Sequence, residues 1–123
     1  MRDRLAEVQF DEVGAETVVA AVTGEIDGSN AGEVQRAVAE HVPTTARALI
    51  VDLTQTAYID STGVELLFEL ARRLSSRRQS FSVVVPQGSG VRRVLELCDI
   101  GSVGLLVATR DEALAAADGA PSA

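Results

Sequence analysis

The segment DLTQTAYIDSTG, residues 52–63, holds the densest group of chemically useful polar side chains in the sequence. It follows a near-continuous apolar run and precedes a long amphipathic pattern. Ser61 and Thr62 both suit a helix N-cap, and Glu65 stands three residues after Thr62, as in a capping box. One interpretation is therefore structural: these hydroxyls only cap a helix.

A second interpretation assigns Ser61 a chemical role. A hydroxyl at a helix N-terminus lies beside unpaired backbone N–H groups and the positive end of the helix dipole, which stabilise a phosphate group. Phosphorylation of Ser61 would therefore preserve the helix, while adding about two negative charges to the surface next to Asp60. That charge would repel an acidic or apolar partner. The segment thus predicts a switch of binding in which the fold is kept.

Composition excludes several other classes of protein. The chain has 123 residues, enough for one domain with one core, and a net charge of −7, which opposes binding to nucleic acid. Its single Cys and single His rule out an internal disulfide and a His/Cys zinc site, and we expect neither a metal nor a cofactor. A serine hydrolase would need His41 as its base, and no Gly-x-Ser-x-Gly elbow is present. No leader and no membrane-spanning apolar run is evident, which predicts a cytoplasmic protein without membrane contact.

The elements that position the polar segment follow from the spacing of apolar residues. Two β-rich patterns at residues 5–13 and 17–23 predict a hairpin, and apolar runs predict strands at 48–53, 81–85 and 103–108. Helical spacing predicts helices at 31–42, 62–78, 89–98 and from 109 onward. Asn30 is placed to cap the first helix, and Thr109 with Glu112 to cap the last. Cys98 falls on the apolar side of its helix and is expected in the core.

The predicted order of elements is β-β-α-β-α-β-α-β-α. Alternation of this kind favours an α/β fold with a mixed sheet, in which an N-terminal hairpin is followed by parallel crossovers and about four helices cover the sheet. We expect a single domain over residues 1–117 and a flexible tail over 118–123.

Three blocks of the sequence resemble STAS domains, the sulfate-transporter and anti-sigma-factor-antagonist family. DLTQTAYIDSTGVELLFEL resembles the family signature, and GEIDGSNAGEV resembles its Gly-Glu-Leu-Asp loop before the first helix. VVPQGSGVRRVLELCDIGSVGLLVATRDEAL resembles the Pro-terminated strand and the elements that follow it. The resemblance extends from about residue 6 to residue 116, and the blocks occur in the family's order.

The resemblance implies an anti-sigma factor antagonist without enzymatic activity of its own. In such a system an anti-sigma factor that is also a serine kinase holds the ATP and phosphorylates Ser61, which ends binding, and a serine phosphatase restores it. Asp27, Asp60 and Gly63 match the family's positions around the phosphosite. Thr62 replaces the commoner second serine and is a secondary candidate for phosphorylation, besides its role as a cap. The free protein is expected to be a monomer.

The surface expected to contact the partner surrounds the start of the long helix. A helical wheel places Leu66 on the polar side, between Glu69 and Arg73, which suggests a partner contact, although single exposed leucines are common. On this hypothesis Leu66→Glu keeps the fold and weakens binding. The full set of expected contacts is Glu25, Ser29, Tyr58, Glu65, Leu66 and Glu69.

Two alternatives stay open at this stage. The first is a non-phosphorylated STAS protein that serves as an accessory or scaffold subunit of a transport or stress-signalling complex. The second is a small hydrolase that uses Ser61, for which the composition offers little support.

Overall fold

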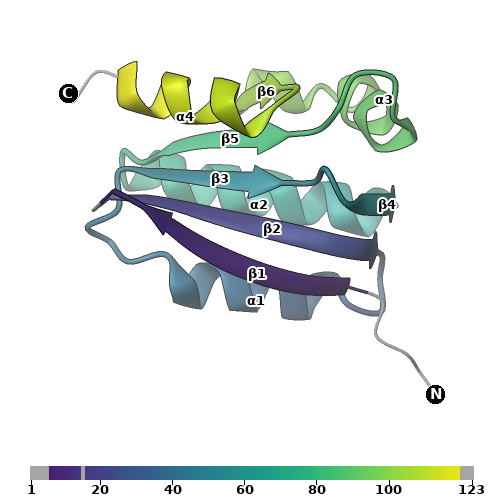
Figure 1. The fold of residues 1–123 in the computed structure, drawn as a ribbon. Helices are drawn as coiled ribbons and strands as arrows, with labels where there is room; N and C mark the ends of the chain where they lie inside the picture. Colours follow the sequence, from purple (N-terminus) through teal and green to yellow (C-terminus); the bar gives the residue numbers. More distant parts are fainter. Residues whose placement is uncertain (1–5, 15, 120–123) are drawn as a thin grey trace.

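The computed structural model describes residues 6–14 and 16–119 and has the predicted α/β architecture (Figure 1). The hairpin of β1 (Ala6–Val13) and β2 (Thr17–Ile26) is antiparallel. β3 (Ala48–Asp52), β5 (Ser80–Val84) and β6 (Leu105–Val107) follow in parallel, which gives the order β1-β2-β3-β5-β6. The helical segments are α1 (Ala31–His41), α2 (Ser61–Ser76), α3 (Gly90–Leu97), the 3₁₀ turn η1 (Ile100–Ser102) and α4 (Arg110–Gly119). Residues 120–123 of the predicted tail lie outside the described residues.

The main core lies on the face of the sheet covered by α1 and α2, which run behind the sheet in Figure 1. The predicted stripe of α1 is buried at Ala31, Val34 and Val38, because apolar residues three and four apart share one face of a helix. The opposite face carries α4 over a much smaller apolar cluster, formed by Val19, Ile50, Val84 and Ala113. Side chains of β3 are therefore buried on both faces, as its continuous apolar run predicted.

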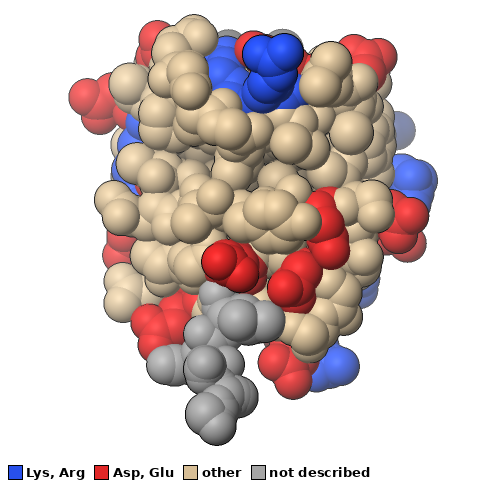
Figure 2. Space-filling view, turned by 90° about the vertical axis from the view of Figure 1, so that its right-hand side faces the viewer, with Lys and Arg blue, Asp and Glu red and all other residues tan. Residues whose placement is uncertain are grey.

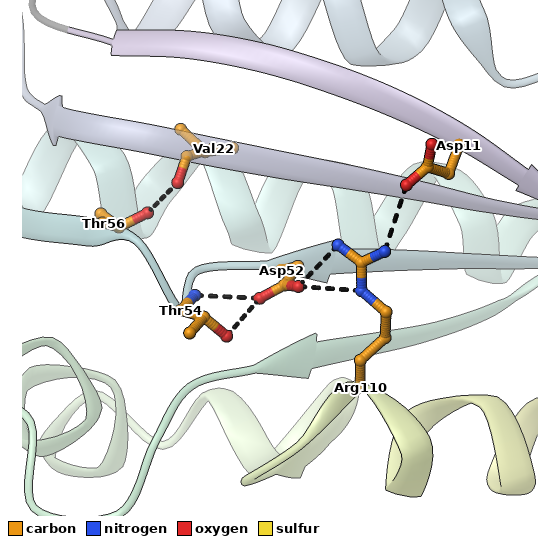
Figure 3. A network of polar contacts seen from close by, with 6 residues as sticks. All are labelled: Asp11, Val22, Asp52, Thr54, Thr56 and Arg110. Carbon is orange, nitrogen blue, oxygen red and sulfur yellow. Dashed lines mark hydrogen bonds and ion pairs between the residues drawn. The ribbon is translucent and has the colours of Figure 1, made fainter.

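The short strand β4 (Thr56–Ile59) is not among the strands predicted from the apolar runs. β4 pairs in parallel with the end of β2, which continues past Gly24 to Ile26. The hydroxyl of Thr56 donates to the buried carbonyl oxygen of Val22 at 2.7 Å, and this bond holds β4 against β2 (Figure 3). Two of the four residues of β4 are exposed, so no apolar run marked it as a strand.

The prediction that Leu66 faces solvent is wrong, because its side chain is only 3% exposed. α2 packs against the sheet and also against α1, so its buried arc is wider than the single stripe used for the wheel. Phe68, two residues further along α2, is only half-buried. Leu66 is therefore a core residue and is not exposed to a partner.

Two further local predictions need correction. Cys98 is exposed, since α3 ends at Leu97 and Cys98 stands at its C-cap, where the chain leaves the helical spacing that placed it in the core. Asn30 precedes α1 but makes no side-chain cap bond, because its amide is used within the loop before the helix. By contrast, the reciprocal bonds between Thr109 and Glu112 confirm the predicted capping box of α4.

Candidate functional site

The site is built where β2 and β4 end side by side. Ile26 and Ile59 are partners in the parallel ladder, and the N–H of Asp60 donates to the carbonyl oxygen of Ile26 at 3.2 Å. The residues that follow these two strands therefore leave the same edge of the sheet. This register brings the loop that begins at Asp27 next to Asp60 and the start of α2.

Asp60, and not Ser61 or Thr62, is the N-cap of α2. Its extended backbone lets its carboxylate accept a hydrogen bond from the N–H of Gly63 at 3.1 Å. Its carbonyl oxygen accepts from the N–H of Val64 at 3.0 Å, as the first bond of the helix. The predicted capping box of Thr62 with Glu65 is therefore wrong, because a preceding carboxylate already fills the position.

Ser61 is consequently the first residue of α2, and it is exposed. Its hydroxyl makes no hydrogen bond to any residue that the structure describes. The first N–H groups of a helix have no intrahelical acceptor, and Asp60 takes only that of Gly63. The Ser61 oxygen thus stands free at the positive end of the longest helix among the described residues.

Gly63 fixes the approach of α2 to the two strand ends. A Cβ atom at this position would lie 2.5 Å from Cγ1 of Ile59 and 3.0 Å from Cγ2 of Ile26. Those distances are shorter than van der Waals contact, so the helix reaches its seat only because this residue lacks a side chain. The packing of Gly63 against Ile26 and Ile59 sets the position of Ser61.

The loop at the end of β2 is held by its own polar side chains. Asp27 accepts from the N–H of Ser29 at 2.9 Å and from its hydroxyl at 2.6 Å. The Ser29 hydroxyl bond is the main cause that lowers the pKa of Asp27, followed by the Ser29 N–H bond, so the carboxylate stays ionised. Asn30, which is buried, accepts from the N–H of Asp27 at 3.0 Å and donates to the carbonyl oxygen of Glu25 at 2.8 Å.

The two loops come into near contact at Gly28 and Thr62. A Cβ atom at Gly28 would lie 3.6 Å from Oγ1 of Thr62, which is itself half-buried. Thr62 is therefore less accessible than Ser61, which is exposed. Between the two candidate acceptors, the geometry favours Ser61.

The remaining predicted contact residues lie around this edge of the sheet. Glu25 and Tyr58 are partners in the β2–β4 ladder, and Tyr58 is 50% exposed. Glu65 and Glu69 are exposed on α2, and Glu69 forms an ion pair with Arg72. Figure 2 shows the face at this end of the molecule: its middle is uncharged, with acidic side chains below and basic ones at the top. Apart from the buried Leu66, the predicted residues are thus available to a partner.

Sequence reasoning missed a polar network that holds the turn between β3 and β4 (Figure 3). One oxygen of Asp52 accepts from the N–H and hydroxyl of Thr54, at 2.9 and 2.5 Å. The other accepts from Nε and Nη2 of Arg110 on α4, at 3.0 and 2.9 Å, and Arg110 also reaches Asp11 on β1 at 3.1 Å. The only sign of this network in the sequence is the Asp52 carboxylate at the end of a buried strand. Its partner Arg110 could not be predicted, because it is 58 residues away in the sequence.

The protonation of Asp52 reflects two opposing effects. Burial raises its pKa, but the hydrogen bonds from Thr54 and Arg110, together with the charge of Arg110, lower it by more. The net pKa is therefore below the ordinary value, and the carboxylate is ionised at neutral pH. Since Thr54 leads directly into β4, this charged network also supports the strand that carries Tyr58.

The site suits a Ser61 hydroxyl that is modified, or that contacts a partner, better than a catalytic hydroxyl. The only histidine of the sequence, His41, lies at the far end of α1, about 15 Å along the helix from the loop at Asp27. It stacks on Phe10 and lies 3.7 Å from the carboxylate of Glu12. Within residues 6–14 and 16–119, no cluster of three or more His, Cys, Asp or Glu residues is arranged to hold a metal ion. In the same part of the chain, no helix has the length and apolar character needed to cross a membrane.

Comparison with known proteins shows which family has this fold. Residues 8–113 match the STAS domain. The chain is 29% identical over 96 residues to the anti-sigma-F factor antagonist RsfB of Mycobacterium tuberculosis, an alignment that covers 78% of this chain and 77% of RsfB. It is also 33% identical over 87 residues to the probable sulfate transporter 3.4 of Arabidopsis thaliana, covering 69% of this chain but only 13% of the transporter.

Solved structures show the same architecture. An anti-sigma factor antagonist from Mycobacterium paratuberculosis superposes with a TM-score of 0.82 at 26% identity, over 92% of this chain and 94% of that one. The anti-sigma factor antagonist SpoIIAA in its unphosphorylated form gives 0.75 at 23% identity, over 94% and 100% of the two chains. SpoIIAA of Bacillus in its phosphorylated form gives 0.67 at 22% identity, over 89% and 97%.

Proposed function

The chain belongs to the STAS domain family, and from that premise we propose that it is a cytoplasmic anti-sigma factor antagonist controlled by phosphorylation of Ser61. In this role it binds an anti-sigma factor, frees a sigma factor for transcription and has no enzymatic activity of its own. The relatives that carry the name antagonist support the class of partner. The partner is proposed to be a serine kinase that holds the ATP, and a separate serine phosphatase resets the switch.

The observation that carries the proposal is the exposed, unbonded hydroxyl of Ser61 at the first position of α2. Free N–H groups at a helix N-terminus stabilise a phosphate, so the modified chain keeps its fold. Four carboxylates, those of Glu25, Asp27, Asp60 and Glu65, stand on the segments around Ser61. A phosphate added among them makes this surface strongly negative, which repels a partner that fits the unmodified surface.

The unmodified surface suits a protein contact. Tyr58 offers a large, half-exposed aromatic ring, a residue type enriched in interfaces, and the hydroxyl of Ser29 donates to Asp27 within the neighbouring loop. Because this loop and the start of α2 are joined through Asp60 and Ile26, a partner meets them as one preformed surface. Binding therefore requires little ordering of the chain.

A kinase reaction tests the proposal. The protein is incubated with ATP and a serine-kinase anti-sigma factor from the same source, and the intact mass and the modified peptide are measured. We expect a single phosphate on Ser61, absent in Ser61→Ala and retained in Thr62→Val. Phosphate on Thr62, or none with any such kinase, contradicts the proposal.

The match to a sulfate transporter favours one other candidate function. In this alternative the chain serves as a non-phosphorylated accessory or scaffold subunit of a transport or stress-signalling complex. It predicts no modification of Ser61 and co-purification with a membrane or scaffold component, independent of ATP.

A further inference from the structure

A groove between α1 and α2 has features that the proposed switch does not use. Residues three and four apart on one face of α1 line it: Gly32, Gln35, Arg36, Ala39 and Glu40. Arg73 of α2 forms the opposite wall, and the groove has a volume of about 350 Å³. Gly32 and Ala39 are small, so the groove is open between the long side chains of its walls.

The two arginines of this groove are unpaired. Arg36 and Arg73 make no ion pair or hydrogen bond through their guanidinium groups with any residue that the structure describes. Arg47, Arg72, Arg92 and Arg110 pair with carboxylates, whereas Arg77, Arg78 and Arg93 have no such partner among the described residues. Glu40 stands four residues after Arg36, a spacing that permits an ion pair, yet no pair forms. Two guanidinium groups are therefore free to bind carboxylates from outside.

An unsatisfied buried acceptor lies next to the groove. The amide of Gln79 is fixed because its Nε2 donates to the carbonyl oxygens of Pro43 and Ala46, at 3.0 and 2.8 Å. Its Oε1 is buried and has no partner among the described residues. Gln79 lines a narrow space of about 10 Å³, which shares Ala39 and Arg73 with the groove and has room for about one water molecule.

We propose that the α1–α2 groove binds an acidic segment of a partner protein, with carboxylates placed between Arg36 and Arg73. An extended peptide fits this groove better than a small molecule does, because ligand pockets are enclosed and mostly apolar, whereas these walls are charged and open. Nucleic acid fits poorly, because binding its backbone needs a basic surface that contacts many phosphates, whereas this groove offers two arginines beside Glu40. Arg73 stands twelve residues after Ser61 on α2, about 18 Å along the helix, so this surface is separate from the phosphosite.

A peptide titration followed by NMR tests this assignment. The intact chain is titrated with a short acetylated and amidated peptide rich in Glu and Leu, and with the same peptide carrying Lys in place of Glu. We expect only the acidic peptide to shift the side-chain signals of Arg36, Arg73 and the Gln79 amide. The shifts should diminish at high salt, because exposed charge pairs are screened.

Matched variants separate the groove from general charge effects. Arg36→Glu with Arg73→Glu should weaken binding on the order of tenfold or more, whereas Arg93→Glu, an exposed arginine on α3, should not. Glu40→Gln should tighten binding because it removes a repelling carboxylate. Ser61→Ala should bind like the unchanged protein.

Several outcomes would overturn the proposal. One is that Arg93→Glu weakens peptide binding as much as the double arginine variant does. Others are that Glu40→Gln weakens binding, that Ser61→Ala abolishes it, or that the NMR shifts map away from the groove. Equal shifts of the groove signals with inorganic phosphate or with duplex DNA would also overturn it, since they indicate a free-anion or nucleic-acid site. All variants alter exposed side chains, and an unchanged circular dichroism spectrum confirms that each is folded.

Discussion

The N–H of Asp60 donates a hydrogen bond to the carbonyl oxygen of Ile26 at 3.2 Å, across the ends of two parallel strands. This bond sets the residue before Ser61 against the residue before Asp27. Two loops 33 residues apart in the sequence thereby form one surface, and the exposed hydroxyl lies on it.

Gly63→Ala should destabilise the protein by about 1–3 kcal/mol, because its Cβ atom would overlap Ile59 and the surrounding side chains are closely packed. Gly32→Ala is the matched control, since a Cβ atom there meets nothing within 4 Å and alanine favours the helix. Urea unfolding measures both. Equal effects of the two substitutions would show that the close approach of α2 is not what requires glycine.

Leu66→Ala should cost about 2–5 kcal/mol in the free energy of unfolding, because the side chain is only 3% exposed and its removal leaves a cavity. Leu97→Ala, at a side chain that is 77% exposed, should change stability by no more than about 0.5 kcal/mol. Thermal and urea unfolding compare the pair. If Leu66→Ala changes the free energy of unfolding only slightly, Leu66 is exposed, as the helical wheel predicts.

Asp52→Asn should destabilise the protein by about 1–2 kcal/mol at neutral pH, because it weakens the bonds to Thr54 and Arg110. The folded pKa of Asp52 is lowered, so its stabilising effect is complete above the ordinary value of about 3.9 and is lost as pH falls through the lower folded value. The difference in stability between the unchanged protein and the variant should therefore shrink in acid.

Urea unfolding midpoints, measured from neutral pH into acid, check how the effect of Asp52→Asn on stability depends on pH. Asp11→Asn serves as the control, because Asp11 contacts the same arginine but its side chain is 65% exposed, and exposed ion pairs contribute little. A difference for Asp52→Asn that stays constant from neutral pH into acid would contradict the role given to its charge.

Much of the fold could be predicted because its signals are local. The continuous apolar run of β3 and the three-and-four spacing in α1 each report burial directly, and both are confirmed. The capping box at Thr109 and Glu112 also depends only on residues three apart. The candidate site around Ser61 could be predicted in part, because Asp60, Ser61 and Gly63 lie close together in the sequence.

The features that were missed depend on distant partners. Leu66 is buried because α1 packs beside α2, which no wheel of α2 alone reveals. β4 exists because the end of β2 offers it a partner, and Asp52 is tied to Arg110 across 58 residues. The cap at Asp60 was overlooked because Ser61 and Thr62, equally good capping residues, follow it directly.

The phosphorylation switch is tested by the affinity of the anti-sigma factor for this chain with and without phosphate on Ser61. Phosphoserine is introduced at position 61 during translation, so that no kinase is needed, and binding is measured by calorimetry alongside the circular dichroism spectrum. We expect the unmodified chain to bind tightly. The phosphorylated chain should keep its fold and bind more weakly by two orders of magnitude or more, about 2.7 kcal/mol. Equal affinity of the two folded forms would contradict the switch.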